Sequence, residues 1–299
     1  MALTINTNLS SMIVQSNLAK ATTSLNQAIE RMTTGYKINH ASDNAAGYSI
    51  ARNWEARLGS LDVAADNAAT GADMLSTLED HYALISQHVQ RVRDLTEQAS
   101  NGTYGSASLK AINSEITARL QEIDRIAVNC EFNGQNMMDG SMRAGVAIQV
   151  GVDGNAAKSQ ISLSGSLFLS GSVGSLFTDF GEIADADVDK VAKLCSGYDV
   201  EQNKVITEKP SAMLAAIDKV INEISSRVTT LGAAQNRIES AIESIGVQSE
   251  NITSSLSTLR DADVAEESSN YIKAQILQQA SATLLATANQ TPSIALNLL

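Results

Sequence analysis

The stretch from Leu214 to Leu259, LAAIDKVINEISSRVTTLGAAQNRIESAIESIGVQSENITSSLSTL, decides the fold of this protein. Mostly apolar residues recur in it at alternating spacings of three and four, and only Gln235 and Ser249 place polar side chains in the series. A seven-residue repeat of this length predicts a helix on the order of 70 Å, at about 1.5 Å per residue. One narrow apolar stripe cannot bury itself, so the helix needs partner helices. The positions are Leu214, Ile217, Ile221, Ile224, Val228, Leu231, Gln235, Ile238, Ile242, Ile245, Ser249, Ile252, Leu256 and Leu259.

The amino-terminal half carries two matching stripes. The first contains small residues at Ala64, Ala68 and Gly71, which would let a partner helix approach closely. Its positions are Leu61, Ala64, Ala68, Gly71, Leu75, Leu78, Tyr82, Ile85, Val89, Val92, Thr96 and Ala99. The second is shorter and consists of Leu109, Ile112, Ile116, Leu120, Ile123 and Ala127. Both predict helices that pack with the helix over 214–259.

Both ends of the sequence repeat the pattern. One stripe is Val14, Leu18, Ala21, Leu25, Ala28 and Met32, and the other is Ile272, Ile276, Ala280, Leu284, Leu285 and Ala288. Ends that both carry heptads most simply pair, which predicts domains that are discontinuous in sequence and an assembly seam of Val14, Leu18, Leu25, Ile272, Ile276 and Leu284. These polar-rich ends gain too little burial alone to offset ordering entropy. We expect them to be mobile in the monomer and to fold when neighbours complete their core.

The middle of the sequence differs from its ends. Half of the eighteen glycines lie between Gly134 and Gly181, together with a run of serines. Residues 147–164 predict two short strands around an Asp153-Gly154 turn. A short helix is expected over Asp187–Cys195. The predicted fold class is mainly α, with long antiparallel helical rods formed by both ends of the protein and a small β-hairpin insert.

Composition limits the function classes. The net charge of −12 makes nucleic acid an improbable partner, because phosphate contacts need clustered Lys and Arg. The sequence contains no run of eighteen apolar residues, so we expect no membrane span. The first twenty residues do not resemble a secretory signal peptide. Cys130 and Cys195 match no metal spacing, and they are either two free thiols or one disulfide.

We find no catalytic, metal or cofactor site, and expect no enzyme activity. The acidic residues Asp185, Asp187 and Asp189 begin like a calcium loop, but Lys190 occupies the position of its glycine. A solvated helix start explains them better. His81 and His88 lack the spacing of a zinc helix and are expected at the surface.

Specific motifs at both ends resemble bacterial flagellin. INTNLSSMIVQSNL (5–18), SLNQAIERMTTGYKINHASDNAAGYSIA (24–51) and QRVRDLTEQASNGT (90–103) are similar to its N-terminal signature. LGAAQNRIESAI (231–242) and SNYIKAQILQQASATLLATANQTPSIALNLL (269–299) are similar to its C-terminus. The similarity covers about residues 1–155 and 210–299.

The resemblance implies a self-assembling subunit of an extracellular motility filament. Residues 1–44 and 262–299 would form its inner tube, and 45–160 with 210–261 the surrounding helical bundle. Residues 161–209 would be a short variable surface segment, so this is a short form with almost no outer domain. The resemblance also implies export through the flagellar type III apparatus without a cleaved signal peptide. Its partners would be an export chaperone at the C-terminal helix, the filament cap and the hook–filament junction proteins.

Two surface sites follow from the resemblance. Arg91, Leu95 and Glu115 match the main contacts of flagellins with Toll-like receptor 5; the alternative is a face evolved for subunit packing. Ser162, Ser164, Ser166, Ser170 and Ser172 are candidates for O-glycosylation, and a flexible polar loop is the alternative.

Three other function classes fit the sequence less well. A hook–filament junction protein would have similar ends, but AQILQQASATLLATANQ (274–290) and QRVRDL (90–95) favour the filament subunit. A zinc-protease insert is excluded because residues 160–210 contain no histidine. A generic coiled-coil scaffold would form a stable dimer instead of a polymer.

Overall fold

The computed structural model describes residues 8–180, 186–206 and 210–296. The protein divides into two compact units. The terminal unit contains Met1–Gly59 and Ser249–Leu299, and the central unit contains Ser60–Gln248. Both ends of the sequence therefore contribute to one unit.

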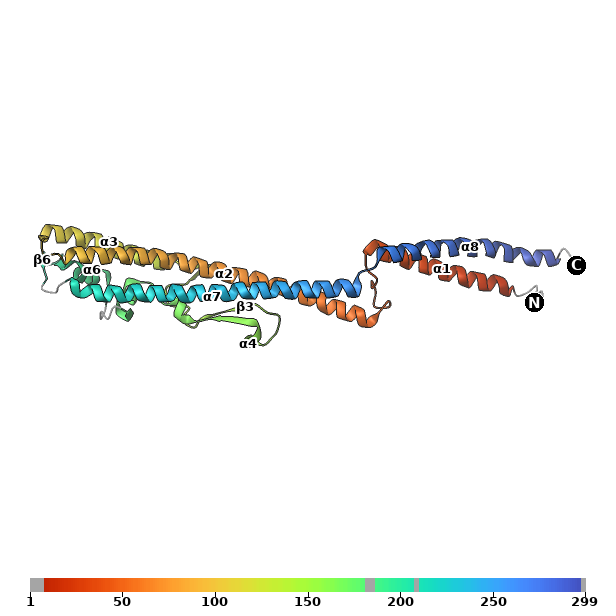
Figure 1. Cartoon of the computed structure of the whole chain (residues 1–299), viewed down its shortest axis with the longest axis horizontal. Helices are drawn as coiled ribbons and strands as arrows, with labels where there is room; N and C mark the ends of the chain where they lie inside the picture. The colour runs from red at the N-terminus through yellow and green to blue at the C-terminus, as the bar shows by residue number, and fades with distance from the viewer. Residues whose placement is uncertain (1–7, 181–185, 207–209, 297–299) are drawn as a thin grey trace. The chain divides into compact units, whose positions relative to one another are not determined.

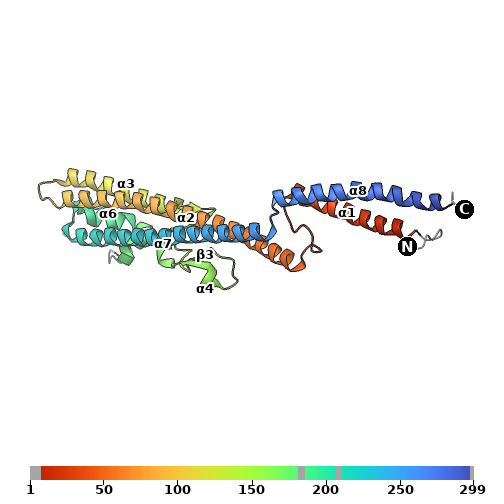
Figure 2. The ribbon, with the colours of Figure 1, turned by 45° about the vertical axis from the view of Figure 1, so that its right-hand side comes forward.

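The terminal unit is built around two helices that pair side by side (Figure 1; Figure 2). Asn8 lies beside Ala288, and Arg31 lies beside Glu267, so the two helices run antiparallel. The unit comprises α1 (Leu9–Thr34), the start of α2 (Ala45–Ala99), the end of α7 (Ser211–Arg260) and α8 (Val264–Leu296).

α1 has defined ends. The Asn8 side chain accepts a hydrogen bond from the Ser11 amide at 3.1 Å and caps the first turn. Gly35 follows the last turn with a φ of 75°, where a residue without a Cβ is favoured, and its amide bonds to the carbonyl of Arg31. Residues 35–44 connect α1 to α2, which begins at Ala45.

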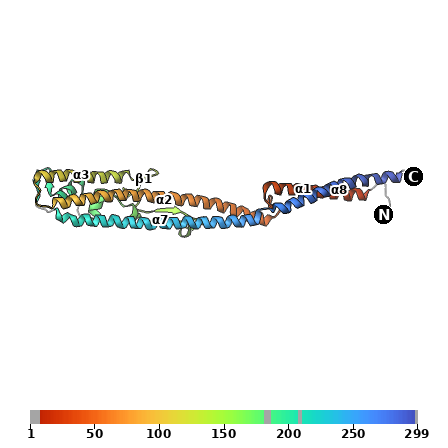
Figure 3. The same ribbon diagram turned by 45° about the horizontal axis from the view of Figure 1, so that its top comes forward.

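The central unit is a helical bundle with one hydrophobic core. Figure 3 shows α2 and α7 side by side, and α3 (Ser106–Asn129) packs with them. Every position of the two stripes predicted for the amino-terminal half is buried. α6 (Val188–Ser196) also packs on α3, where Asn113 donates a hydrogen bond to Ser196 at 2.8 Å. The short helix expected over Asp187–Cys195 is confirmed within one residue, with Asp187 as its cap.

Only five of the fourteen predicted seam positions of α7 are buried. Ile217, Ile224, Leu231, Ile238 and Ile245 are buried as expected. The other predicted positions are only half-buried, and between Met213 and Ala234 the residues that precede them line the core instead. Because α7 packs in a multi-helix bundle rather than against one partner, its apolar face is wider than a two-helix seam. The additional buried residues of α7 are Met213, Val220, Arg227 and Ala234.

In the part of the protein that the structure describes, the strands form three small antiparallel pairs. They are β1 (Glu131–Phe132) with β2 (Gln135–Asn136), β3 (Val146–Gln149) with β4 (Gln160–Leu163), and β5 (Tyr198–Asp199) with β6 (Lys204–Val205). The pairing of the predicted hairpin is confirmed, with Ile148 opposite Ile161. The predicted Asp153-Gly154 turn is wrong: residues 150–159 connect the strands and include α4 (Ala156–Ser159), which Asn155 caps.

The serine-rich segment after β4 packs on the bundle rather than forming a polar loop. Its apolar residues Leu167, Phe168, Val173 and Phe177 are fully or almost fully buried. These residues alternate with the serines, so the segment has an inner and an outer face. The segment contains η1 (Gly165–Phe168), α5 (Val173–Ser175) and η2 (Leu176–Phe180).

Candidate assembly surface

The two terminal helices meet through small side chains. Ala21 and Ala28 of α1 and Ala274 and Ser281 of α8 are buried. Small residues let the backbones approach closely, but they bury little apolar area. In α1, the predicted seam residues Val14, Leu18 and Leu25 are half-buried.

The predicted seam residues of α8 lie elsewhere. Ile272, Ile276 and Leu284 are 54%, 59% and 57% exposed. The row that α8 presents to α1 instead includes Glu267, Ala274 and Ser281. Within a single copy of the protein these three side chains of α8 are thus largely uncovered. α1 also exposes large apolar residues, namely Leu9, Met12, Ile13, Ile29 and Met32.

A groove of about 700 Å³ follows the α1–α8 pair. Ala21, Ala28 and Ala274 line it, together with Leu277 and Leu284. A second hollow on α8 contains Ile272 and Ile276. We call the exposed side chains of Ile272, Ile276, Leu277 and Leu284 the outer face of α8.

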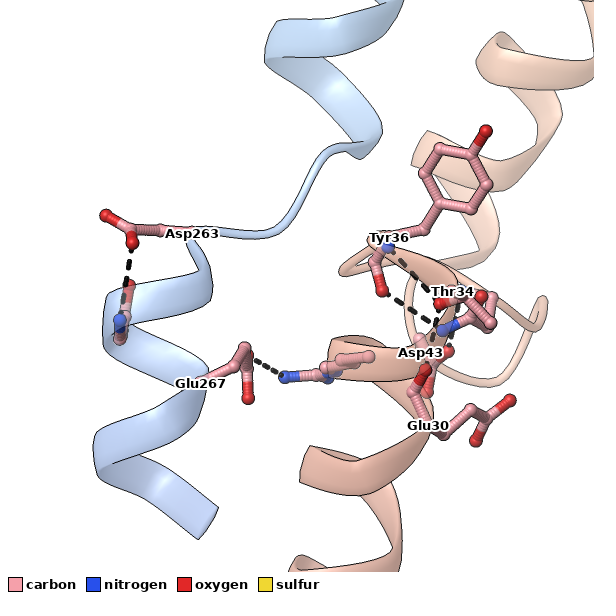
Figure 4. Close-up of polar contacts among 9 residues, drawn as sticks. Glu30, Thr34, Tyr36, Asp43, Asp263 and Glu267 are labelled. Atoms are coloured by element: carbon pink, nitrogen blue, oxygen red, sulfur yellow. Dashed lines mark hydrogen bonds and ion pairs between the residues drawn. The ribbon is translucent and has the colours of Figure 1, made fainter. Parts of the chain in front are cut away.

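Polar contacts hold the two helices in register at both ends. At one end, the side-chain amide of Asn8 donates a hydrogen bond to the carbonyl of Ala288 at 2.7 Å, and the Ser11 hydroxyl donates to Oδ1 of Asn289 at 2.8 Å. At the other end, Arg31 pairs with the almost buried Glu267 at 3.1 Å (Figure 4). The pair is therefore aligned by its polar termini rather than by a large apolar core.

The backbone enters and leaves this helix pair through a short antiparallel joint. Tyr36 and Asp261 form a β-bridge, and the Lys37 amide donates to the Arg260 carbonyl at 2.7 Å. The Arg260 guanidinium lies 4.0 Å from the centre of the Tyr36 ring and pairs with Glu55. This joint ties the ends of α1, α2 and α7 together within the terminal unit.

Two aspartates shape the loops of the joint (Figure 4). Asp43 accepts hydrogen bonds from the amides of Asn39 and His40, and the His40 amide lowers the pKa of this carboxyl. Asp263 caps α8 by accepting from the Ala265 amide at 2.8 Å. Both act as local backbone acceptors.

Of the three predicted receptor contacts, the structure brings two together on the surface. Arg91 of α2 and Glu115 of α3 form an ion pair at 2.8 Å, and both side chains are partly exposed. Leu95 is 1% exposed and belongs to the core, so its side chain is not available to a partner on this surface.

The candidate glycosylation serines divide into two groups. Ser162, Ser164 and Ser166 are exposed. Ser170 and Ser172 are half-buried and bond to each other at 3.0 Å.

One buried arginine was not predicted from the sequence. Arg227 is 3% exposed, and its Nη1 donates to the Tyr82 hydroxyl at 3.1 Å. Tyr82 in turn donates to the Leu167 carbonyl at 3.1 Å, and burial raises the pKa of its hydroxyl. The three residues connect α7, α2 and the serine-rich segment. A sequence signal existed: Val220, Arg227 and Ala234 repeat every seven residues.

The described residues contain no metal-binding cluster of His, Cys, Asp or Glu. Asp185 lies outside the described residues, while Asp187 serves as a helix cap. Cys130 and Cys195 are buried and not disulfide-bonded, and burial raises the pKa of each thiol to about 12. His81 and His88 are half-buried. No helix in the described part of the protein is both long and apolar enough to cross a membrane.

Comparisons with known proteins agree with this architecture. Residues 5–143 match the family profile of the bacterial flagellin N-terminal helical region, and residues 214–299 match that of the C-terminal helical region. The protein is 33% identical to flagellin of Bacillus subtilis over 306 aligned residues, with 99% of each sequence covered. It is 34% identical to flagellin of Xenorhabdus nematophila, with both sequences fully covered.

A solved structure shares the fold. The structure of a putative flagellar hook-associated protein from Vibrio parahaemolyticus matches 73% of this protein and all of its own length, with a TM-score of 0.58 and 13% identity. The family profiles and the full-length similarity to flagellins show that this protein belongs to the bacterial flagellin family, as a short form without a large outer domain.

Proposed function

We propose that this protein is the structural subunit of a flagellar filament and polymerises through its terminal unit. Residues 1–44 and 262–299 would form the inner tube, 45–160 with 210–261 the surrounding bundle, and 161–209 the outer surface. The observation that carries the proposal is the uncovered outer face of α8. The contact of α8 with α1 buries mainly alanines and a serine and leaves this face exposed. The proposed role is structural and needs no catalysis.

The energetics favour assembly over an isolated terminal unit. Burying an isoleucine or leucine fully is worth roughly 1.5–3 kcal/mol, so covering the half that remains exposed gains roughly 1 kcal/mol per side chain. Ile272, Ile276 and Leu284 alone would supply several kcal/mol per contact with a second copy. Repetition of such contacts along a filament would make the polymer stable.

Seeded assembly tests the proposal. Short filament fragments are added to purified monomer, and polymer is counted by negative-stain electron microscopy. We expect filaments from the full-length protein and none from variants that lack residues 1–44 or 262–299. Ile276→Asp should also stop elongation. Val200→Asp is the matched control, since Val200 is 52% exposed in the central unit, and it should still polymerise.

The same experiment separates the filament subunit from a hook–filament junction protein, the second function considered for a protein with this fold. A filament subunit elongates without limit as monomer is added. A junction protein stops after few copies. Growth that halts at a fixed short length would favour the junction role.

We also propose that released monomer is recognised by Toll-like receptor 5 through the Arg91–Glu115 surface. The ion pair fixes an exposed guanidinium and a carboxylate across α2 and α3, a geometry suited to charge-assisted hydrogen bonds with a partner. Arg91→Ala should weaken receptor binding at least about tenfold, or 1.4 kcal/mol. Arg125→Ala, which removes an exposed α3 arginine paired with Glu122, is the control. Equal affinities of both variants would reject the assignment.

The export chaperone is proposed to bind α8. A chaperone would cover the outer face of α8 before export and so prevent early polymerisation. Copurification of the chaperone with the full-length protein, but not with a variant that lacks residues 262–299, is expected. Retention by the truncated variant would place the chaperone elsewhere.

O-glycosylation remains a proposal for the exposed serines Ser162, Ser164 and Ser166. Ser162 is exposed on β4, and Ser164 and Ser166 are exposed directly after it, whereas Ser170 and Ser172 are partly covered. Intact-protein mass of native filaments tests it, since a mass equal to that of the bare polypeptide excludes glycans.

A further inference from the structure

The sequence contains two Asn-Gly pairs in different structural settings. Asn101-Gly102 lies in the loop between α2 and α3, and Asn133-Gly134 forms the turn between β1 and β2. All four residues are exposed to solvent. Asparagine followed by glycine is the pair in which the backbone amide can most easily reach the side-chain amide, because glycine has no Cβ in the way.

The loop geometry favours that approach at Asn101. Its Oδ1 accepts a hydrogen bond from the Thr103 amide at 3.3 Å. The ring closed by this bond includes the Gly102 nitrogen, so the Asn101 side chain is folded back over the backbone that carries this nitrogen. The same bond draws electron density from the carbonyl and favours negative charge on Oδ1.

We propose that Asn101 is a site of spontaneous deamidation in the folded protein. Solvent base removes the Gly102 amide proton, and the nitrogen attacks Cγ of Asn101. A bond forms between the Gly102 nitrogen and Cγ, Nδ2 takes a proton from water, the bond between Cγ and Nδ2 breaks, and ammonia leaves. One water then opens the resulting succinimide at either carbonyl, which gives aspartate or isoaspartate. The product carries one more negative charge than the original protein, whose net charge is −12.

Asn133 is chemically identical but held differently. Asn133 and Gly134 have φ values of 51° and 76° in a two-residue hairpin turn, with Phe132 paired to Gln135. To reach the cyclic intermediate, this turn would have to leave its left-handed geometry and strain the β1–β2 pairing. A penalty of only about 1.4 kcal/mol would slow the reaction about tenfold. The fold should therefore protect Asn133.

The test follows both sites in the intact protein. Purified protein is held in mildly alkaline buffer, sampled over days and digested, and aspartate and isoaspartate at each site are quantified by mass spectrometry. We expect Asn101 to convert at least about tenfold faster than Asn133 in the folded protein, and both to convert at similar rates in urea. Similar rates in the folded protein, or no conversion at Asn101, would overturn the proposal.

Two variants define the mechanism. Gly102→Ala should slow conversion at Asn101 about tenfold, because the added methyl hinders ring closure. An alanine fits without strain, since a Cβ at Gly102 would have no neighbour within 4 Å, so the fold is preserved. Thr103→Ala keeps the amide donor and should leave the rate unchanged. An unchanged rate in Gly102→Ala would contradict attack by the Gly102 nitrogen.

Discussion

Two glycines of the central unit have opposite surroundings. A Cβ on Gly165 would lie 1.8 Å from the backbone carbonyl oxygen of Arg143, whereas a Cβ on Gly232 would meet nothing within 4 Å. Gly165 therefore permits a close crossing of two backbone segments beside β4. Gly232 only loosens the middle of α7.

These surroundings predict stability changes of opposite sign. Gly165→Ala should destabilise the protein by about 3 kcal/mol, because backbone cannot move aside cheaply. Gly232→Ala should stabilise it by about 1 kcal/mol through helix propensity. Urea unfolding of both variants checks the prediction. Equal effects would mean that the Gly165 crossing is not as close as described.

The hydroxyl of Tyr82 satisfies two buried groups at once. Tyr82→Phe should cost about 1–3 kcal/mol, because Arg227 and the Leu167 carbonyl each lose a buried partner. Tyr104→Phe removes only a contact from the exposed Gln98 and should change stability by less than about 0.5 kcal/mol. Thermal unfolding measures both. A neutral Tyr82→Phe would show that these groups find other partners.

Two carboxyls of the central unit should depend on pH in opposite ways. Burial raises the pKa of Asp124, so its contribution favours folding at low pH and is lost as pH rises through the folded pKa. Lys193 lowers the pKa of Asp199, assisted by backbone amides, so its contribution is present at neutral pH and is lost as pH falls through the folded pKa.

Substitution by asparagine makes the difference measurable. Asp124→Asn keeps an acceptor for the Val173 amide and should raise the melting temperature at neutral pH but not in acid. Asp199→Asn should lower it at neutral pH, with a difference that shrinks below about pH 4. Melting temperatures of both variants and of the unmodified protein, measured from neutral pH to below about pH 4, test the prediction. Shifts of the same sign in both variants at neutral pH would contradict the opposite pKa directions of Asp124 and Asp199.

At the scale of helices and strands, sequence periodicity correctly predicted the apolar stripes that are buried within a single copy of the protein. The stripes of α2 and α3 were correct because their partners are part of the same subunit. In α7, periodicity alone could not distinguish a two-helix seam from a wider bundle face, so Arg227 was missed. In α8, the large apolar residues Ile272, Ile276 and Leu284 were predicted to face α1, yet α1 packs against Ala274 and Ser281, because small residues allow the close approach of the two helices.

The helix pair of the terminal unit should be the least stable element of the monomer. It buries mainly alanines, a serine and Glu267, whereas the central unit has an extensive apolar core. Amide hydrogen exchange should be fast throughout α1 and α8 and slow along the central parts of α2, α3 and α7. Equal protection in the monomer would show that polar registration at the two ends stabilises the pair more than we expect.

At the scale of the whole molecule, the two units differ in how completely they bury their large apolar side chains. The central unit buries most of its large apolar side chains in one core, including those of the serine-rich segment, which was predicted to be a surface segment. The terminal unit leaves Ile272, Ile276 and Leu284 uncovered although they follow the helical repeat. A subunit with one self-sufficient unit and one incomplete unit is suited to growth by addition of copies.

We expect a second copy of the protein to complete the terminal unit. An electron cryomicroscopy reconstruction of filaments assembled from this protein would show whether it does. We expect Ile272, Ile276 and Leu284 to pack against side chains of a neighbouring copy. A filament in which these three residues face water, while the copies touch only through their central units, would contradict it.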